Sequence, residues 1–142
     1  MAFAPDMIVA LIARIREKAN RFIAAELERH GLEGLKPIHG DILLALFRYD
    51  APTMKELAEL VDRKKSTVTT LVEKLVRLGY AVKRQDEADC RAYRISLTEE
   101  GRALRQPLID ISDRLMRKVY KQMPAAERKR LVRGLTKIND GW

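Results

Sequence analysis

Several residue types that would mark a particular class of protein are scarce in this sequence. Cys90 is the only cysteine, so no disulfide can form within one chain and an oxidising compartment is not implied. No stretch reaches the roughly 18 uninterrupted apolar residues that a membrane span needs, and the N-terminal stretch lacks the features of a signal peptide. We therefore expect a cytoplasmic protein with no membrane partner.

Patterns that carry catalysis or bind metals are also missing. His30 and His39 are the only histidines, and neither stands in an HExxH or Ser-His-Asp context. The string DEAD, Asp86 to Asp89, has no glycine-rich phosphate-binding loop with it. We therefore expect no enzyme activity, no metal site and no cofactor.

Apolar and charged residues, by contrast, are abundant. Among 142 residues, 46% are hydrophobic and 34% charged, with only 7 Gly and 5 Pro, which favours one helix-rich globular unit. The 28 Lys and Arg exceed the 20 Asp and Glu and give a net charge of +8. This excess favours a polyanionic partner such as nucleic acid, although a solvated basic surface would have the same composition.

Apolar residues recur at helical spacing near both ends of the chain. One such helix is predicted from Pro5 to about Glu28, with Gly31 as its stop. After Thr98, a predicted N-cap, apolar residues extend for about six turns with a bend at Pro107, and Pro124 begins a further helix.

The centre of the sequence predicts a helix-turn-helix. A mostly apolar helix is expected from Pro37, and Thr53 with Glu56 forms a capping box for a short helix that ends near Asp62. The next stretch, VDRKKSTVTTLVEKLVRLGY, has an apolar face that includes Val68, Val72 and Leu75, and an opposite polar face.

The first half of that stretch is basic and rich in hydroxyls. Such a helix can enter the major groove of DNA, where hydroxyls and basic groups contact bases or phosphates. Ser and Thr also cluster at helix starts simply to satisfy backbone amides, so this segment alone favours both interpretations equally. The candidate DNA-contacting residues here are Arg63, Lys64, Lys65, Ser66, Thr67, Thr69, Thr70 and Lys74.

Alternation around a polar turn predicts a β-hairpin in YAVKRQDEADCRAYRISLT. A helix-turn-helix followed by a charged hairpin is the winged-helix arrangement. Arg84, Asp89 and Arg91 are its candidate DNA-binding residues, with Asp89 expected to hold Arg91 extended through charge-assisted hydrogen bonds. One face is expected to carry Val82, Tyr93, Ile95 and Leu97, and the other Lys83, Arg94 and Ser96.

These motifs, in this order, resemble the MarR family of winged-helix transcriptional regulators. STVTTLVEKLVRLGY is similar to the family's recognition helix, and DEADCRAYRISLTEEG to its wing, with Asp-x-Arg-Ala followed by Leu-Thr-x-x-Gly. The resemblance covers about Pro37 to Gly101, and the flanking helices fit the dimerisation region. It implies a homodimer on a pseudopalindromic operator in double-stranded DNA, usually as a repressor, with Arg91 of each wing in the minor groove.

Two positions depart from the family pattern. Cys90 stands where a second arginine is often found, and Thr70 where an arginine is frequent, so the operator sequence cannot be taken over from relatives. Cys90 leaves open a thiol-based redox-sensing regulator, against the alternative of an ordinary exposed thiol. A winged helix used for protein interaction or for nonspecific nucleoid binding is a further alternative.

The resemblance also implies a small aromatic or phenolic effector, held between the dimer helices and the winged region. Phe22, His39 and Phe47 are candidate neighbours of such a ligand, although each is equally explained as core or surface.

The expected fold is mainly α with a small β-hairpin, in one compact chain. Residues 1–36 form an N-terminal dimerisation helix, 37–98 the winged helix-turn-helix, and 99–142 the C-terminal dimerisation helices. A small central region cannot cover all the apolar stripes of these helices, so a second copy is expected to bury them. The candidate dimerisation residues are Ile8, Leu11, Ile12, Ile15, Leu115, Val119, Leu131 and Leu135.

Overall fold

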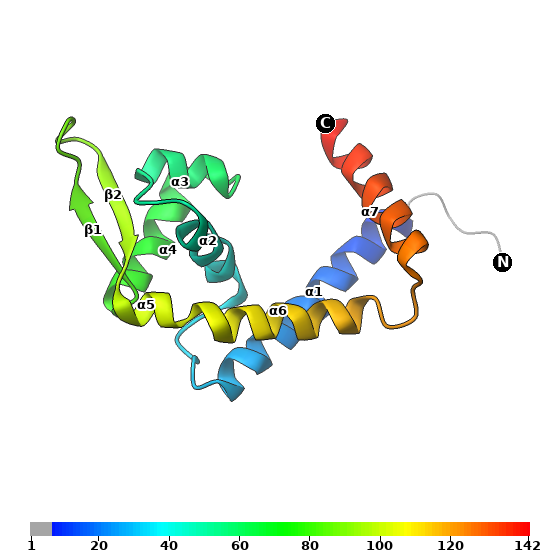
Figure 1. Cartoon of the computed structure of the whole chain (residues 1–142). Helices are drawn as coiled ribbons and strands as arrows, with labels where there is room; N and C mark the ends of the chain where they lie inside the picture. The colour runs from blue at the N-terminus through cyan, green and yellow to red at the C-terminus, as the bar shows by residue number, and fades with distance from the viewer. Residues whose placement is uncertain (1–6) are drawn as a thin grey trace.

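A computed structural model describes residues 7–142 and confirms a mainly helical chain with one β-hairpin (Figure 1). The predicted helix start at Pro5 lies outside the described residues. The winged-helix elements gather at one end of the molecule, and α1, α6 and α7 extend away from them (Figure 1). The elements are α1 (Met7–Arg29), α2 (Pro37–Arg48), α3 (Met54–Leu60), α4 (Lys65–Arg77), β1 (Ala81–Gln85), β2 (Tyr93–Leu97), α5 (Glu99–Ala103), α6 (Arg105–Val119) and α7 (Ala125–Asp140).

None of the helices in this described part is long and apolar enough to span a membrane.

One apolar core joins the helix-turn-helix to the hairpin. Val68, Val72 and Leu75 of α4 are fully buried, as the spacing of the sequence predicts. They meet side chains of α2 and α3 and Ile95 of β2, and burial of each large side chain contributes about 1.5–3 kcal/mol. The apolar face of α4 is thereby used for packing, which leaves its opposite face to solvent. The fully buried side chains are Ile42, Leu43, Leu57, Val68, Val72, Leu75 and Ile95.

The strand register differs from the one expected. Ala81 pairs with Leu97 and Lys83 with Ile95, and directly paired residues share a face of the hairpin. The prediction that Val82 shares a face with Ile95, and that Lys83 lies on the opposite face, was therefore wrong. The alternation of each strand is compatible with either offset, and a long polar turn does not reveal which offset the strands adopt.

Thr98 ties the hairpin to the helices on either side of it. Its hydroxyl donates to the carbonyl of Gly79 (2.6 Å) and accepts from the amide of Gly101 (3.0 Å), so Thr98 caps α5 as predicted. A Cβ atom on Gly101 would overlap the carbonyl oxygen of Tyr80, so only glycine permits this close approach. The Leu-Thr-x-x-Gly pattern therefore fixes how the wing meets α5.

The predicted bend in the C-terminal helix is a break. The helix stops at Ala103 and restarts at Arg105, because Pro107 has no amide proton and its ring would clash with the carbonyl four residues back. The second segment ends at Val119.

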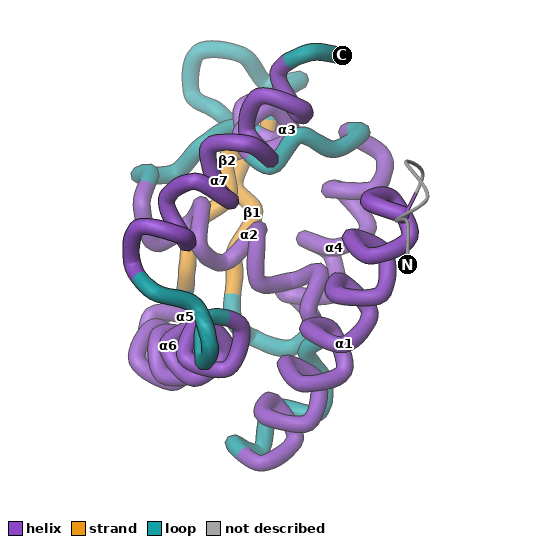
Figure 2. The backbone as a smooth tube through the Cα atoms, turned by 90° about the vertical axis from the view of Figure 1, so that its right-hand side faces the viewer, coloured by secondary structure: helices purple, strands orange, loops and turns teal. Residues whose placement is uncertain are grey.

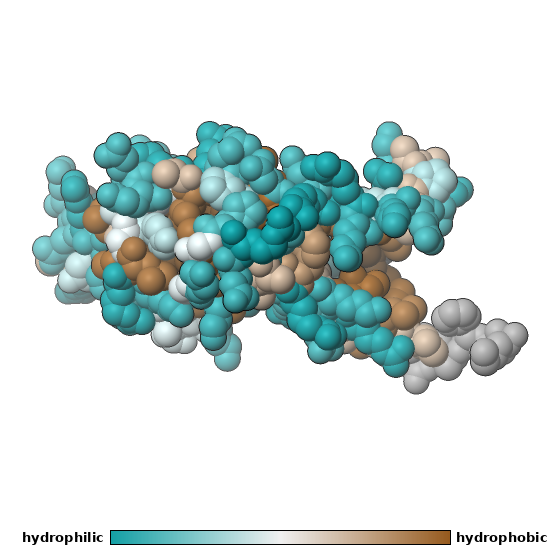
Figure 3. Space-filling model, turned by 90° about the horizontal axis from the view of Figure 1, so that it is seen from below, coloured by the Kyte–Doolittle hydropathy of each residue, from teal (hydrophilic) through white to brown (hydrophobic). Residues whose placement is uncertain are grey.

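The three long helices outside the winged region leave much apolar surface uncovered. Glu26 of α1 lies 3.2 Å from Arg114 of α6, which joins these two helices. In Figure 2, which views α6 nearly end-on, α1 lies to one side of it and α7 rises above it. No residue of α7 is buried, and the arm that leads to the grey N-terminal residues is strongly apolar in Figure 3.

Candidate nucleic-acid interface

The helix-turn-helix begins with the predicted capping box. The Thr53 hydroxyl accepts from the Glu56 amide (3.1 Å), and the Glu56 carboxylate accepts from the Thr53 amide (2.9 Å). The helix that this box starts ends at Leu60, and Asp62 adopts a left-handed conformation (φ 52°) in the turn that follows. This tight turn sets α4 against α3 with the first residues of α4 exposed.

The exposed start of α4 presents both ammonium and hydroxyl groups. Thr69 and Thr70 donate their hydroxyls to the helix carbonyls of Lys65 (2.8 Å) and Ser66 (3.2 Å). The hydroxyls of Ser66 and Thr67 make no hydrogen bond to the described part of the chain and are exposed, as are Lys64, Lys65 and Thr70. These two hydroxyls are therefore free to bond a partner.

Two predicted DNA-binding residues face the protein instead. A guanidinium nitrogen of Arg63 lies 3.3 Å from a carboxylate oxygen of Asp41 on α2. Lys74 is half-buried, and its charge acts on His39. The structure exposes Lys64, Lys65, Ser66, Thr67 and Thr70, whereas Arg63 pairs with α2 and Lys74 is half-buried.

On the wing, Arg84, Asp89 and Arg91 are all exposed. The carboxylate of Asp89 accepts from the backbone amide of Arg91 (3.0 Å). The expected contact between Asp89 and the Arg91 guanidinium is therefore corrected: Asp89 holds the backbone of Arg91, in the local turn geometry that aspartate favours. Cys90, between them, is an exposed free thiol.

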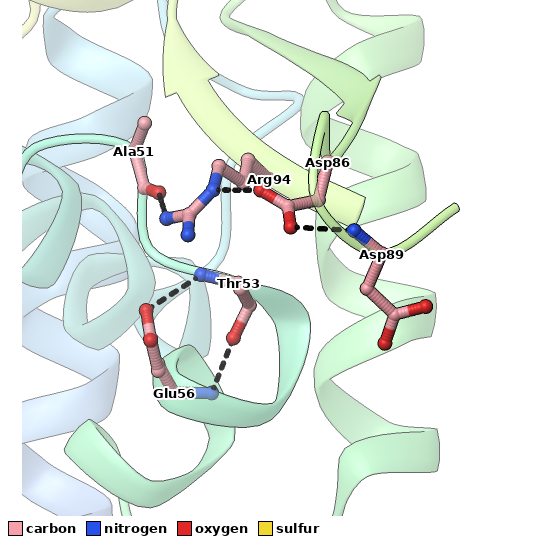
Figure 4. A network of polar contacts seen from close by, with 6 residues as sticks. All are labelled: Ala51, Thr53, Glu56, Asp86, Asp89 and Arg94. Carbon is pink, nitrogen blue, oxygen red and sulfur yellow. Dashed lines mark hydrogen bonds and ion pairs between the residues drawn. The ribbon is translucent and has the colours of Figure 1, made fainter. Parts of the chain in front are cut away.

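The sequence did not identify Asp86 and Arg94 as functional residues. Arg94 forms an ion pair with Asp86 and donates to the carbonyl of Ala51 (2.8 Å), in the connection between α2 and α3 (Figure 4). The hydrogen bond from Arg94 holds the pKa of the Asp86 carboxyl below its ordinary value. The two residues have opposite charge and lie at opposite ends of the predicted hairpin turn, but only the folded hairpin shows that their side chains meet.

The structure places the three candidate effector neighbours in different surroundings. Phe22 lies under the ammonium of Lys118, which is 5.3 Å from its ring centroid. Phe47 lines a cavity of about 650 Å³ that also includes Arg48 and Arg105. His39 does not line this cavity.

His39 instead belongs to the core at the start of α2. It is only 2% exposed, and its Nδ1 accepts from the backbone amide of Lys36 (2.9 Å), the position that glutamate or glutamine fills in a capping box. Its Nε2 has no hydrogen-bond partner within residues 7–142. Burial, with a smaller contribution from the charge of Lys74, lowers the pKa of His39 below the ordinary value of 6.5.

Comparison with known proteins confirms the resemblance seen in the sequence. A family model described as MarR family matches residues 33–92. The HTH-type transcriptional regulator SarZ of Staphylococcus aureus is 35% identical over 88 residues, which are 62% of this chain and 57% of SarZ. The chain thus spans 57% of the length of the curated relatives that it matches. The winged-helix region of the chain is thus similar to the MarR family.

Solved structures extend the similarity of fold to nearly the whole chain. A MarR protein from Peptoclostridium difficile superposes with a TM-score of 0.88 at 18% identity, over 99% of this chain and 90% of that one. The S. aureus MepR–DNA complex gives 0.86 at 22% identity, over 99% and 100%. A mutant of Escherichia coli MarR complexed with operator DNA gives 0.85 at 20%, over 94% of each chain. The winged-helix fold is confirmed.

We expect acid to destabilise the protein through His39. The pKa of His39 is lower in the folded state than in the unfolded state, so the unfolded state binds the proton first as the pH falls. The free energy of unfolding therefore decreases as the pH drops below about 6.5, and this decrease ends once the pH is below the folded-state pKa. Urea unfolding at about pH 7.5 and about pH 5.5 measures this loss.

The variant His39→Gln should lose less stability than the wild type between these pH values, because glutamine accepts from the same amide without titrating. The matched control His30→Gln, at an exposed histidine, should keep the wild-type loss. An undiminished loss in His39→Gln would show that His39 is not the group responsible.

Proposed function

We propose that the protein is a homodimeric, sequence-specific DNA-binding transcriptional regulator. The observation that carries this proposal is the start of α4, where Lys64 and Lys65 stand beside the free hydroxyls of Ser66 and Thr67. The fold shared with MarR and MepR in complexes with DNA supports the same assignment. The net charge of +8 suits a polyanionic partner.

In this proposal α4 lies in the major groove. Lys64 and Lys65 contact phosphates, and the hydroxyls of Ser66 and Thr67 bond base edges. Arg84 and Arg91 of the wing reach the backbone and the adjacent minor groove, where a narrow groove attracts arginine. Phosphate contacts position the protein, while the hydroxyls read sequence.

The uncovered apolar faces support a dimer. Ile8, Leu11, Ile12 and Ile15 project from α1 with 39–56% of their surface exposed, and α7 has no buried residue at all. Most of the stability of a helix in a protein comes from packing of its apolar face, so these uncovered faces favour a partner. A second copy related by a two-fold axis would bury these faces and place two α4 helices about 34 Å apart, one turn of DNA.

We further propose that the regulator is a repressor controlled by a small aromatic or phenolic acid. The cavity lined by Phe47 supports this ligand class, because it places two guanidinium groups, Arg48 and Arg105, near the aromatic rings of Phe47 and Tyr49. An anion could pair with the arginines while its ring contacts the apolar wall.

Replacing Thr67 with alanine tests whether α4 reads sequence. Loss of a base contact should weaken binding to a duplex selected from random DNA by about 1–3 kcal/mol and leave binding to a scrambled duplex unchanged. The contrasting variant Lys64→Ala should weaken both equally and lower the salt slope by about one for each of the two chains. Equal losses on both duplexes for Thr67→Ala would favour nonspecific binding instead.

Replacing Leu131 with aspartate tests the proposed dimer. Leu131 of α7 is 42% exposed in one chain, so aspartate there costs a monomer little but places an unpaired charge in the interface. We expect sedimentation equilibrium to show monomers for this variant. Leu60→Asp, at an equally exposed leucine on α3, should remain dimeric. A folded dimer of unchanged stability in Leu131→Asp would place the interface elsewhere.

A further inference from the structure

A continuous path of hydrogen bonds runs from the α2–α3 connection to the wing tip (Figure 4). The carbonyl of Ala51 accepts from Nη1 of Arg94 (2.8 Å), and Nε of Arg94 donates to one carboxylate oxygen of Asp86. The other carboxylate oxygen of Asp86 accepts from the backbone amide of Asp89 (3.1 Å). The Asp89 carboxylate in turn accepts from the amide of Arg91 (3.0 Å). The backbone at Arg91 is therefore linked to the helix-turn-helix by specific polar contacts.

Backbone contacts also join the α2–α3 connection to the edge of β2 that does not pair with β1. The amide of Ile95 donates to the carbonyl of Pro52 (3.0 Å), and Thr53 forms an isolated antiparallel bridge with Arg94. Thr53 is also the N-cap of α3. The segment that starts α3 thus serves as a short third strand beside the wing, and Arg94 fastens this junction.

The environment of Arg94 distinguishes it from the basic residues proposed to meet DNA. Its hydrogen bond to Asp86, together with the charges of Asp86, Glu56 and Asp50, raises its pKa. Its positive charge is therefore already compensated by carboxylates. Neither Arg84 nor Arg91 has an ion pair within the described residues, so their charges remain available to phosphate.

The shape of the guanidinium explains why this position requires arginine. Arg94 bonds Asp86 through Nε and the carbonyl of Ala51 through Nη1, using two donors that a planar fork holds in fixed directions. The ammonium of lysine is a single point charge and cannot reproduce both directions. Asp86 is only 14% exposed, so this contact is partly shielded from water.

We propose that Asp86 and Arg94 are positioning residues, which hold the wing tip and Arg91 at a fixed angle to the helix-turn-helix without contacting DNA themselves. This role rests on the DNA-binding function proposed above. The turn between the strands would otherwise lose conformational freedom when DNA binds, and ordering it beforehand lowers that cost.

The variant Asp86→Asn separates positioning from simple charge. It removes a negative charge from a surface proposed to face DNA, so electrostatics alone would tighten binding. Positioning has the opposite consequence, because asparagine cannot hold Arg94 as an ion pair. We expect about fivefold to tenfold weaker binding to the selected duplex, with an unchanged salt slope, since no phosphate contact is removed.

Glu87→Gln is the matched control. Glu87 belongs to the same turn, carries the same charge, is exposed, and has no side-chain hydrogen bond or ion pair in the described part of the chain. Its replacement should leave binding unchanged or slightly tighter. Asp86→Asn that binds as tightly as Glu87→Gln would overturn the proposal.

A measurement made without DNA tests the positioning role separately from the proposed DNA-binding function. Cys90, the only cysteine, is exposed at the wing tip and accepts a nitroxide spin label. We expect Asp86→Asn and Arg94→Lys to increase the mobility of the label, and Glu87→Gln to leave it as in the wild type. Wild-type mobility in both network variants would overturn the positioning role. A wild-type protein that ordered its wing but bound selected and scrambled duplexes equally would instead overturn sequence-specific binding.

Discussion

The single apolar core beneath α2, α3, α4 and β2 is the constraint on which the other features depend. Val72 of α4 and Ile95 of β2 are fully buried in the same cluster as Ile42 and Leu57. Because close-packed side chains resist independent movement, α4 and the wing are held as one unit. The residues excluded from this core, lysines and hydroxyls on α4 and arginines on the wing, form the proposed DNA surface.

Polar contacts fix the conformation of the hairpin turn, which apolar packing does not determine. Core side chains fix where the hairpin lies but not the conformation of its long turn, which is mostly exposed. Thr98 fixes the base of the wing through Gly79 and Gly101, while Arg94 connects the turn, through Asp86, to the start of α3. Leu27 of α1 and Ile111 of α6 join the same core, whereas α7 buries no residue.

Local features could be predicted from the sequence, and features set by distant contacts could not. The Thr53 capping box and the buried face of α4 follow from spacings of three and four residues, and the structure confirms both. The strand register depends on the path of a long turn, and the bond from Arg94 to Ala51 joins residues 43 positions apart. His39 was a candidate effector neighbour through the family resemblance alone, and no local pattern shows that it is buried. The direction of Arg63 toward Asp41 likewise depends on how α2 packs.

We propose that two chains present paired α4 helices and wings to one DNA site. Native mass spectrometry of the protein with a duplex selected from random DNA counts the chains that bind each duplex. We expect a complex of two chains with one duplex, formed in preference to a scrambled duplex of equal length at the same salt concentration. One chain per duplex, or a series of complexes that gain chains as the duplex lengthens regardless of its sequence, would contradict it.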